Sequence, residues 1–140
     1  MKTKTTVVVS GAFDVLHPGH LNFFKQAKAL GDRLVVIIGR DDTVKKIKGQ
    51  FPLHSQDERL QMVSAVPEVD EVFIGSPGPA YVILQDLHPD IIALGYDQMP
   101  EKELQAQLDE MGLKAKIVRL KPFHPEKYKS SLVGDGAHKG

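Results

Sequence analysis

The chain has 140 residues, no cysteine, and 18 basic side chains balanced by 18 acidic ones. Its hydrophobic content of 41% and charged content of 26% are typical of one globular domain with a sizeable core. The zero net charge argues against a broad basic face for nucleic acid, and the missing cysteines exclude disulfides and cysteine-bound metals. The first apolar run is too short for a signal peptide or membrane span, so we expect a cytoplasmic protein with no membrane partner.

Short apolar runs alternate with segments of helical periodicity along the chain. In chain order we expect a strand at 5–10, a helix at 18–30, a strand at 33–39, a short basic helical segment at 41–49, a helix at 55–66, a strand at 71–75, a helix at 79–87, a strand at 90–95, a helix at 101–112 and a strand at 114–120. Strands separated by helices form right-handed βαβ units around a parallel sheet. The pattern therefore predicts a single-domain, doubly wound, five-stranded α/β fold over residues 1–133, with a disordered tail at 134–140.

A glycine-rich turn, G-A-F-D-V-L-H-P-G-H, spans residues 11–20 between the first strand and the first helix. Backbone N–H groups at a helix start and the helix dipole favour an anion. His17 and His20 are three residues apart, so both imidazoles lie on one face of the helix. Gly11 and Gly19 would let a large ligand approach the backbone. These features together predict a phosphate site.

Two other interpretations of this turn stay open from the residues alone. The two histidines could cap and solvate the helix start. They could also ligate a metal with Asp14 as a third ligand, although nothing nearby completes such a set cleanly.

Further polar segments follow other expected strands. A lysine cluster (Lys45, Lys46 and Lys48) follows the second strand, a proline-glycine turn at 76–79 follows the third, and the segment 95–98 follows the fourth. A lysine cluster is by itself more often a solvated face, and the two turns are unremarkable strand endings. However, ligands of open parallel sheets bind beyond the carboxyl ends of the strands, where all these segments fall. Their common position favours one shared crevice.

The 11–20 turn resembles the signature of the cytidylyltransferase-like nucleotidyltransferases, in which H-x-G-H binds and activates a nucleoside triphosphate. The match covers Gly11, Phe13, Asp14, His17, Gly19 and His20. The resemblance implies a Rossmann-like nucleotidyltransferase fold. It implies catalytic roles for His17, His20 and Lys48, and nucleotide contacts from Gly11, Ala12, Phe13, Asp14, Gly19, Gly95, Tyr96, Asp97, Ser130 and Ser131. It also suggests substrate contacts from Lys45, Lys46, Arg59 and Lys129, and no protein ligands to a metal.

Within this superfamily the chain is most similar to archaeal-type FAD synthetases, which are FMN adenylyltransferases. The similarity lies in residues 40–49, 89–92, 95–98 and 122–124, ahead of the serine pair at 130–131. Gln98 stands where glycerol-phosphate cytidylyltransferases usually have tryptophan. One departure from the archaeal-type enzymes is that they often carry cysteines near the C-terminal motif, whereas this chain has none. Two departures from the wider superfamily are Gln50, where some glycerol-phosphate cytidylyltransferases have a second basic residue, and Lys129, which replaces the apolar residue of the late motif.

This resemblance implies transfer of AMP from ATP to the phosphate of FMN, with a divalent ion, Mg²⁺, bridging phosphate oxygens and a homodimer as the assembly. A first alternative is a cytidylyltransferase that uses CTP and glycerol 3-phosphate or another small phosphorylated alcohol. A second is a nucleotide-binding module without catalysis. A class I aminoacyl-tRNA synthetase fragment is disfavoured, because the chain has no K-M-S-K-S loop.

Overall fold

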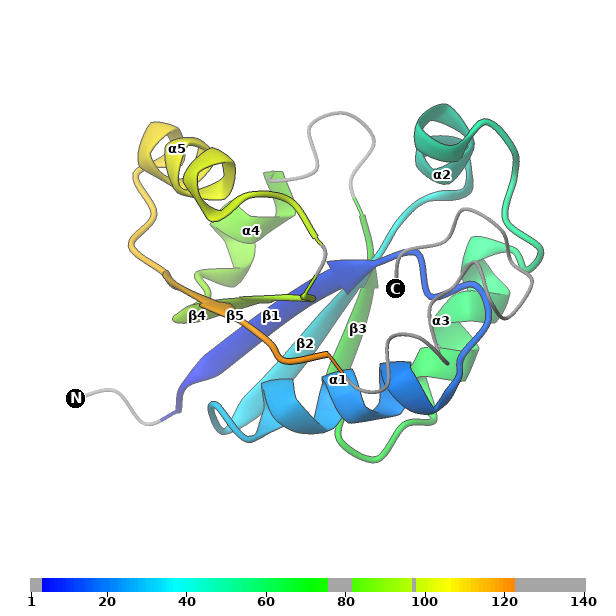
Figure 1. The fold of residues 1–140 in the computed structure, drawn as a ribbon, viewed down its shortest axis with the longest axis horizontal. Coiled ribbons are helices and arrows are strands. Elements are labelled where there is room, and N and C mark those ends of the chain that lie inside the picture. Colours follow the sequence, from blue (N-terminus) through cyan, green and yellow to red (C-terminus); the bar gives the residue numbers. More distant parts are fainter. Residues whose placement is uncertain (1–3, 76–81, 97, 123–140) are drawn as a thin grey trace.

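The computed structural model describes residues 4–75, 82–96 and 98–122. One parallel sheet has the strand order β3-β2-β1-β4-β5 (Figure 1). Its strands are β1 (Thr6–Gly11), β2 (Arg33–Ile38), β3 (Glu71–Ile74), β4 (Ile91–Leu94) and β5 (Lys116–Arg119). The helices are α1 (Pro18–Lys28), α2 (Asp41–Lys48), α3 (Gln56–Ser64), α4 (Val82–Leu87) and α5 (Glu101–Met111). The predicted Rossmann-like α/β fold is confirmed.

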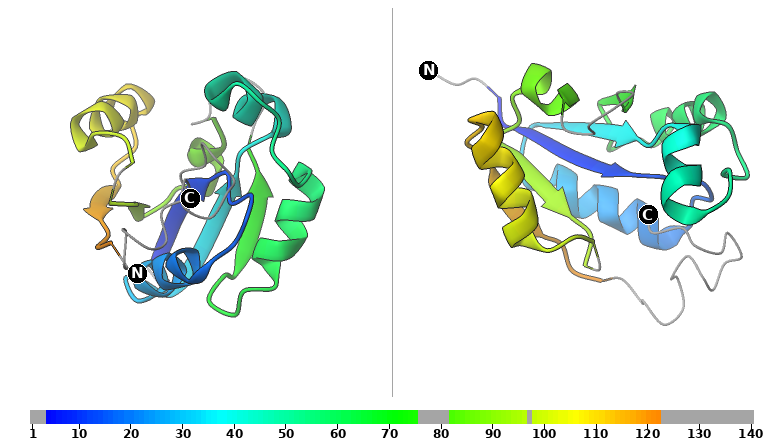
Figure 2. Two further views of the ribbon diagram at one scale, coloured as in Figure 1. Left: turned by 45° about the vertical axis from the view of Figure 1, so that its right-hand side comes forward. Right: turned by 90° about the horizontal axis from the view of Figure 1, so that it is seen from above.

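The alternation of side chains along the strands divides the core into two layers. Val7 and Val9 of β1 pack with α1 and α3 on one face of the sheet, whereas Val8 packs with α4 and α5 on the other. Figure 2 shows α2 beyond the carboxyl ends of β1 and β2, outside both layers. Within the described residues, no helix combines the length and the apolar character that crossing a bilayer requires. The fold thus leaves α2 beside the edge where the polar segments gather.

The expected element boundaries agree with the structure to within a few residues. A capping box begins α3: Glu58 N–H donates to Ser55 Oγ (3.2 Å) and Ser55 N–H donates to Glu58 Oε1 (2.9 Å). α1 ends at Lys28 rather than 30, because the 30 and 31 amides bond to carbonyls three residues back. The turn predicted at 76–79, and residues 79–81 of the helix predicted at 79–87, lie outside the described residues.

The sheet order places a topological switch point between β1 and β4. β1 pairs with β2 on one side and with β4 on the other, so the connections diverge at this pair of strands. Gln98 ties their carboxyl ends together: its Nε2 donates to Ser10 O (3.2 Å), and its Oε1 accepts from Gly95 N–H (2.6 Å). The edge expected to receive a ligand is therefore held by a side-chain bridge.

Candidate active site

The two histidines of the 11–20 turn lie against each other at the start of α1. His17 is the N-cap of the helix, and its Nδ1 accepts from Gly19 N–H at 3.1 Å. Because Nδ1 accepts, we infer that the neutral ring carries its proton on Nε2 and donates from that atom. The rings of His17 and His20 stack with centroids 3.9 Å apart and an interplanar angle of 23°. The structure therefore brings together the two imidazoles whose spacing predicted one shared ligand.

His20 is a neutral group at neutral pH. Its side chain is buried, with 3% exposure, and its ring meets Phe13 edge to face at 5.5 Å. Burial lowers the pKa of His20 to about 3, helped by the nearby positive charges of His17 and Lys48 and opposed by a hydrogen bond with the Val15 backbone. Burial also lowers the pKa of His17. The pair consequently carries no positive charge at neutral pH, and the donor that it offers is the Nε2 proton of His17.

The lowered pKa of His20 predicts a loss of stability in mild acid. Between pH 6.5 and about 3 the unfolded chain binds a proton at His20 that the folded chain does not. As the pH is lowered through this window, the free energy of unfolding should therefore decrease, by up to about 1.4 kcal/mol per pH unit. Urea unfolding between pH 7 and 4.5 measures the slope.

The variant His20→Asn provides the control for this pH dependence. Because asparagine does not titrate, the variant should show a shallower slope than the wild type. The carboxylates of Asp70 and Glu58 also have lowered pKa values, but they weaken the fold only below about pH 4 to 4.5, outside most of this window. Equal slopes in the two proteins would contradict the assignment.

The backbone amides at the start of α1 are already used within the turn. Gly19 N–H donates to the His17 ring, while the His20 and Leu21 amides donate to His17 O at 2.9 and 3.2 Å. A phosphate at this point would have to displace these bonds. An amide grip on a phosphate therefore requires these bonds to open, and the imidazole pair with Lys48 provides the other candidates for holding an anion.

The glycine at position 11 is required by the core. Phe13 is fully buried with a positive φ of 50°, and its ring packs against Phe24 at 5.1 Å. A Cβ on Gly11 would lie 2.9 Å from the Phe13 ring, which is closer than real contacts allow. This packing adds a second reason for glycine to the close ligand approach that we expected. It also limits any nucleotide contact from Phe13 to its backbone.

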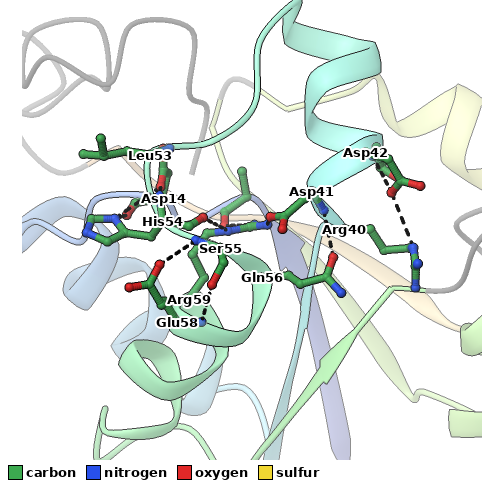
Figure 3. Close-up of polar contacts among 12 residues, drawn as sticks. Asp14, Arg40, Asp41, Asp42, Leu53, His54, Ser55, Gln56, Glu58 and Arg59 are labelled. Carbon is green, nitrogen blue, oxygen red and sulfur yellow. Dashed lines mark hydrogen bonds and ion pairs between the residues drawn. The ribbon is translucent and has the colours of Figure 1, made fainter.

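Asp14 links the 11–20 turn to the segment before α3. Its buried carboxylate accepts from Leu53 N–H at 2.6 Å and from His54 N–H at 2.8 Å, and the His54 Nδ1 lies 2.8 Å from Asp14 O (Figure 3). Both carboxylate oxygens are therefore occupied by backbone donors. These contacts favour a positioning role for Asp14 over the nucleotide contact that we expected, and they weaken the interpretation in which Asp14 is a metal ligand.

Arg59 of α3 joins three segments from a fully buried position. Its Nε donates to His54 O (3.0 Å), one terminal nitrogen to Ala12 O (2.8 Å) and the other to Asp41 Oδ1 (2.7 Å) (Figure 3). Asp41 opens α2, and its N–H in turn donates to Gln56 Oε1 at 2.9 Å. We call Asp14, Asp41, His54 and Arg59 the clamp. The buried guanidinium favours a positioning role over the substrate contact expected of Arg59.

The three lysines of α2 differ in their surroundings. Lys45 and Lys46 are exposed, and Lys45 Nζ lies 5.1 Å from the centroid of the Phe51 ring. Lys48 is half-buried, and its charge is close enough to His20 to lower the pKa of that ring. Lys48 therefore lies near the imidazole pair, and it is a candidate for the positive charge that the neutral rings lack.

The carboxyl end of β4 forms the other side of the switch point. Arg119 of β5 donates to the carbonyls of Gly95 and Gln98, both at 2.9 Å, and to that of Met99 at 2.8 Å. The side chain of Tyr96 is 37% exposed at this edge. Nothing in the sequence pattern pointed to Arg119 as the support of this turn. The expected site residues Asp97, Lys129, Ser130 and Ser131 lie outside the described residues.

The clamp residues Asp41 and His54 were also not among the predicted site residues. One sequence signal could have found them: Arg59 interrupts the apolar face of α3, four residues before the buried Val63. A charged residue at a core position needs partners, and Asp41 is the acid at the start of the preceding helix.

Known proteins resemble this chain along most of its length. The family model Cytidylyltransferase-like matches residues 8–134, nearly the whole chain. The chain therefore belongs to the cytidylyltransferase-like family. A solved pantoate-beta-alanine ligase from Francisella tularensis, at 17% identity and a TM-score of 0.61 over 94% of this chain and 68% of its own, shares the fold.

Several relatives within this family carry one common name. A protein named FAD synthase from Thermococcus sibiricus is 44% identical over 94% of this chain and 88% of its own length. Another protein named FAD synthase, from Pyrococcus abyssi, is 44% identical over 86% of this chain and 82% of its own. A solved structure from Thermoplasma volcanium, titled as a lipopolysaccharide core biosynthesis protein, is 38% identical with a TM-score of 0.82, covering 86% of this chain and 99% of that one.

Proposed function

We propose that this protein is an FMN adenylyltransferase, an FAD synthase, which transfers AMP from ATP to the phosphate of FMN and releases pyrophosphate. The observation that carries this proposal is the similarity along most of the chain to proteins named FAD synthase, at 41% to 44% identity. The stacked imidazoles at the carboxyl end of β1 support the same reaction class, because nucleotidyl transfer needs positioned donors around a triphosphate.

The reaction is a direct in-line displacement. An oxygen of the FMN phosphate forms a bond to the α-phosphorus of ATP, the bond from that phosphorus to the bridging oxygen breaks, and pyrophosphate leaves with the electron pair. The attacking phosphate is already ionised at neutral pH, so no general base is needed. Neutral His17 donates from Nε2 to a phosphate oxygen, and Lys48 balances the phosphate charge. The single N–H of neutral His20 is hydrogen-bonded to the Val15 backbone, so His20 donates to a phosphate oxygen only once that bond opens. The imidazoles act as hydrogen-bonding groups and Lys48 acts as the cation, because the pKa values of both imidazoles are lowered.

The divalent ion enters this reaction as part of the nucleotide substrate. In the described ranges 4–75, 82–96 and 98–122, no three His, Asp or Glu side chains converge to form a metal cage, and both oxygens of Asp14 accept from backbone amides. Mg²⁺ retains several waters and binds readily through substrate phosphates. We therefore assign Mg²⁺ to the ATP phosphates rather than to a resident protein site.

The remaining nucleotide contacts are assigned by position and resemblance. Gly95, Tyr96 and Asp97 follow β4, which is the neighbour of β1 at the switch point, so we assign them to the ribose and base. Ser130 and Ser131 are assigned to the β- and γ-phosphates, with Lys129 and the exposed Lys45 and Lys46 as supporting cations. Gly11, Ala12 and Gly19 contribute backbone at the turn.

We also propose that residues 1–133 form the catalytic domain and 134–140 a tail without a role. A homodimer and a cytoplasmic location complete the proposal. The zero cysteine content supports a reducing compartment.

Pyrophosphate release tests the function directly. The purified protein is incubated with Mg²⁺ and each of the four nucleoside triphosphates, with FMN or glycerol 3-phosphate as acceptor. We expect release with ATP and FMN, and FAD as the product by chromatography. Release with CTP and glycerol 3-phosphate would instead establish the cytidylyltransferase alternative. Tight ATP binding without release for any acceptor would establish a binding module.

A further inference from the structure

Three large apolar side chains are exposed at the end of α2 and in the segment that follows it. Ile47 at the end of α2 is 75% exposed, Phe51 is 61% exposed and Leu53 is 75% exposed. We call these three residues the apolar patch. Exposed apolar groups gathered in one short segment, rather than scattered singly, mark a surface that binds something.

The apolar patch is attached to the candidate phosphate site by direct hydrogen bonds. The Leu53 and His54 amides both donate to the Asp14 carboxylate, and Asp14 lies within the turn that carries His17. Figure 3 shows the Leu53 side chain extending away from the clamp while its backbone is held by Asp14. At its other end the segment leaves α2 at Gly49, directly after Lys48. The patch is therefore fixed between the turn and the lysine of the proposed site.

The lysines beside the apolar patch indicate which kind of ligand it binds. Lys45 Nζ lies 5.1 Å from the centroid of the Phe51 ring, and Lys48 follows Ile47 on α2. A surface of apolar groups with lysines beside them suits a ligand that combines a flat apolar ring with an acidic group. Contact of the patch with the same patch of a second copy would bring like charges together, which disfavours that occupant.

We propose that the apolar patch binds the isoalloxazine ring of FMN, with Phe51 stacking on the ring and the FMN phosphate directed toward Lys48 and the imidazole pair. This inference rests on the proposed function and extends it by assigning the acceptor subsite. FMN carries its flat ring and its phosphate at opposite ends of a ribityl chain. The ring needs an exposed apolar surface that is separate from the phosphate contacts, and the patch provides one.

Steady-state kinetics on patch variants test this assignment. Phe51→Ala should raise the KM for FMN by roughly 3- to 10-fold, the loss expected for one stacking partner. The KM for ATP should not change. Riboflavin has the ring but no phosphate, so its inhibition constant against FMN should rise by the same factor, which separates loss of stacking from a displaced Lys45.

Three further variants and one binding assay complete the design. Phe51→Tyr should restore the wild-type KM for FMN, Leu53→Ala should raise it, and Leu21→Ala, which removes an exposed side chain of α1, should leave it unchanged. Quenching of riboflavin fluorescence measures binding without turnover. Unchanged KM and inhibition constants in Phe51→Ala and Leu53→Ala would overturn the proposal. If these two variants sedimented differently from the wild type while their flavin kinetics stayed unchanged, the patch would be a contact between copies of the chain, and the proposal would also be overturned. If the wild-type protein quenches riboflavin, and Phe51→Ala weakens that binding, but no FAD forms, the subsite stands and the proposed reaction fails.

Discussion

Replacing His20 by alanine is expected to lower kcat by about 10² to 10³, the usual cost of removing one donor from developing charge. The imidazole is buried against His17 and Phe13, where water cannot easily replace its hydrogen bond. Because the pKa of His20 is about 3, the wild-type ring is neutral and its lost contribution is a hydrogen bond rather than a charge. The measurement is FAD formation at saturating ATP and FMN, with circular dichroism to verify the fold.

The variant His20→Asn separates the donor role from simple packing. An amide donor in place of the neutral imidazole should recover part of the lost kcat, whereas a positive charge in His20→Lys should not. If His20→Ala turned over at a near-normal rate, or if His20→Lys were the better of the two replacements, the role assigned to His20 would be wrong.

Breaking the clamp is expected to produce the largest loss of stability. Arg59→Leu should lower the free energy of unfolding by about 3 to 5 kcal/mol, as is typical when one partner of a buried charged contact is removed. The substitution leaves the Ala12 and His54 carbonyls and the Asp41 carboxylate without the donor that the structure gives them. Urea unfolding at neutral pH measures the change.

A surface arginine provides the matched control. Arg33 donates to Glu71 between two neighbouring strands, but its side chain is 31% exposed and that of Glu71 is 42% exposed. Arg33→Leu should therefore cost no more than about 1 kcal/mol. A loss of similar size in the two variants would show that burial of Arg59 adds nothing to its contacts. An Arg59→Leu protein that is as stable as the wild type would contradict the clamp itself.

Local patterns were sufficient to predict the fold. The helix expected at 55–66 is α3, whose start the Ser55 and Glu58 capping box fixes, and the strand expected at 33–39 is β2, whose continuous apolar run is buried. Boundaries were less accurate where the last turn of a helix tightens, as after Lys28. These features depend on neighbours within a few residues, which a sequence displays directly.

The site was only partly predictable, because its contacts join distant segments. The spacing of His17 and His20 predicted their pairing, since both lie on one helical turn. Arg59 reaches Ala12 across 47 residues, and no local pattern specifies such a contact. The need for glycine at position 11 has a further reason that the sequence does not display, because a Cβ there would meet the buried ring of Phe13.

Gln98 illustrates the same limit. Its identity suggested a difference in substrate from the enzymes that usually have tryptophan at this position. Its geometry adds a structural function, since the amide holds the ends of β1 and β4 together through Ser10 and Gly95. A residue that appears specific for substrate in a sequence can thus support the backbone around the site.

The clamp has a mechanical consequence. Asp14 and Arg59 join the turn that carries the imidazoles to α2 and to the segment with the apolar patch, so these surfaces move as one stiff body. The three connections are the hydrogen bonds from Leu53 to Asp14, from Arg59 to Ala12 and from Arg59 to Asp41. Local opening of any one of them would release the others, because they share the Arg59 side chain or involve neighbouring residues of the chain. While these hydrogen bonds hold, ATP and FMN of the proposed reaction would bind to surfaces whose relative position is already fixed.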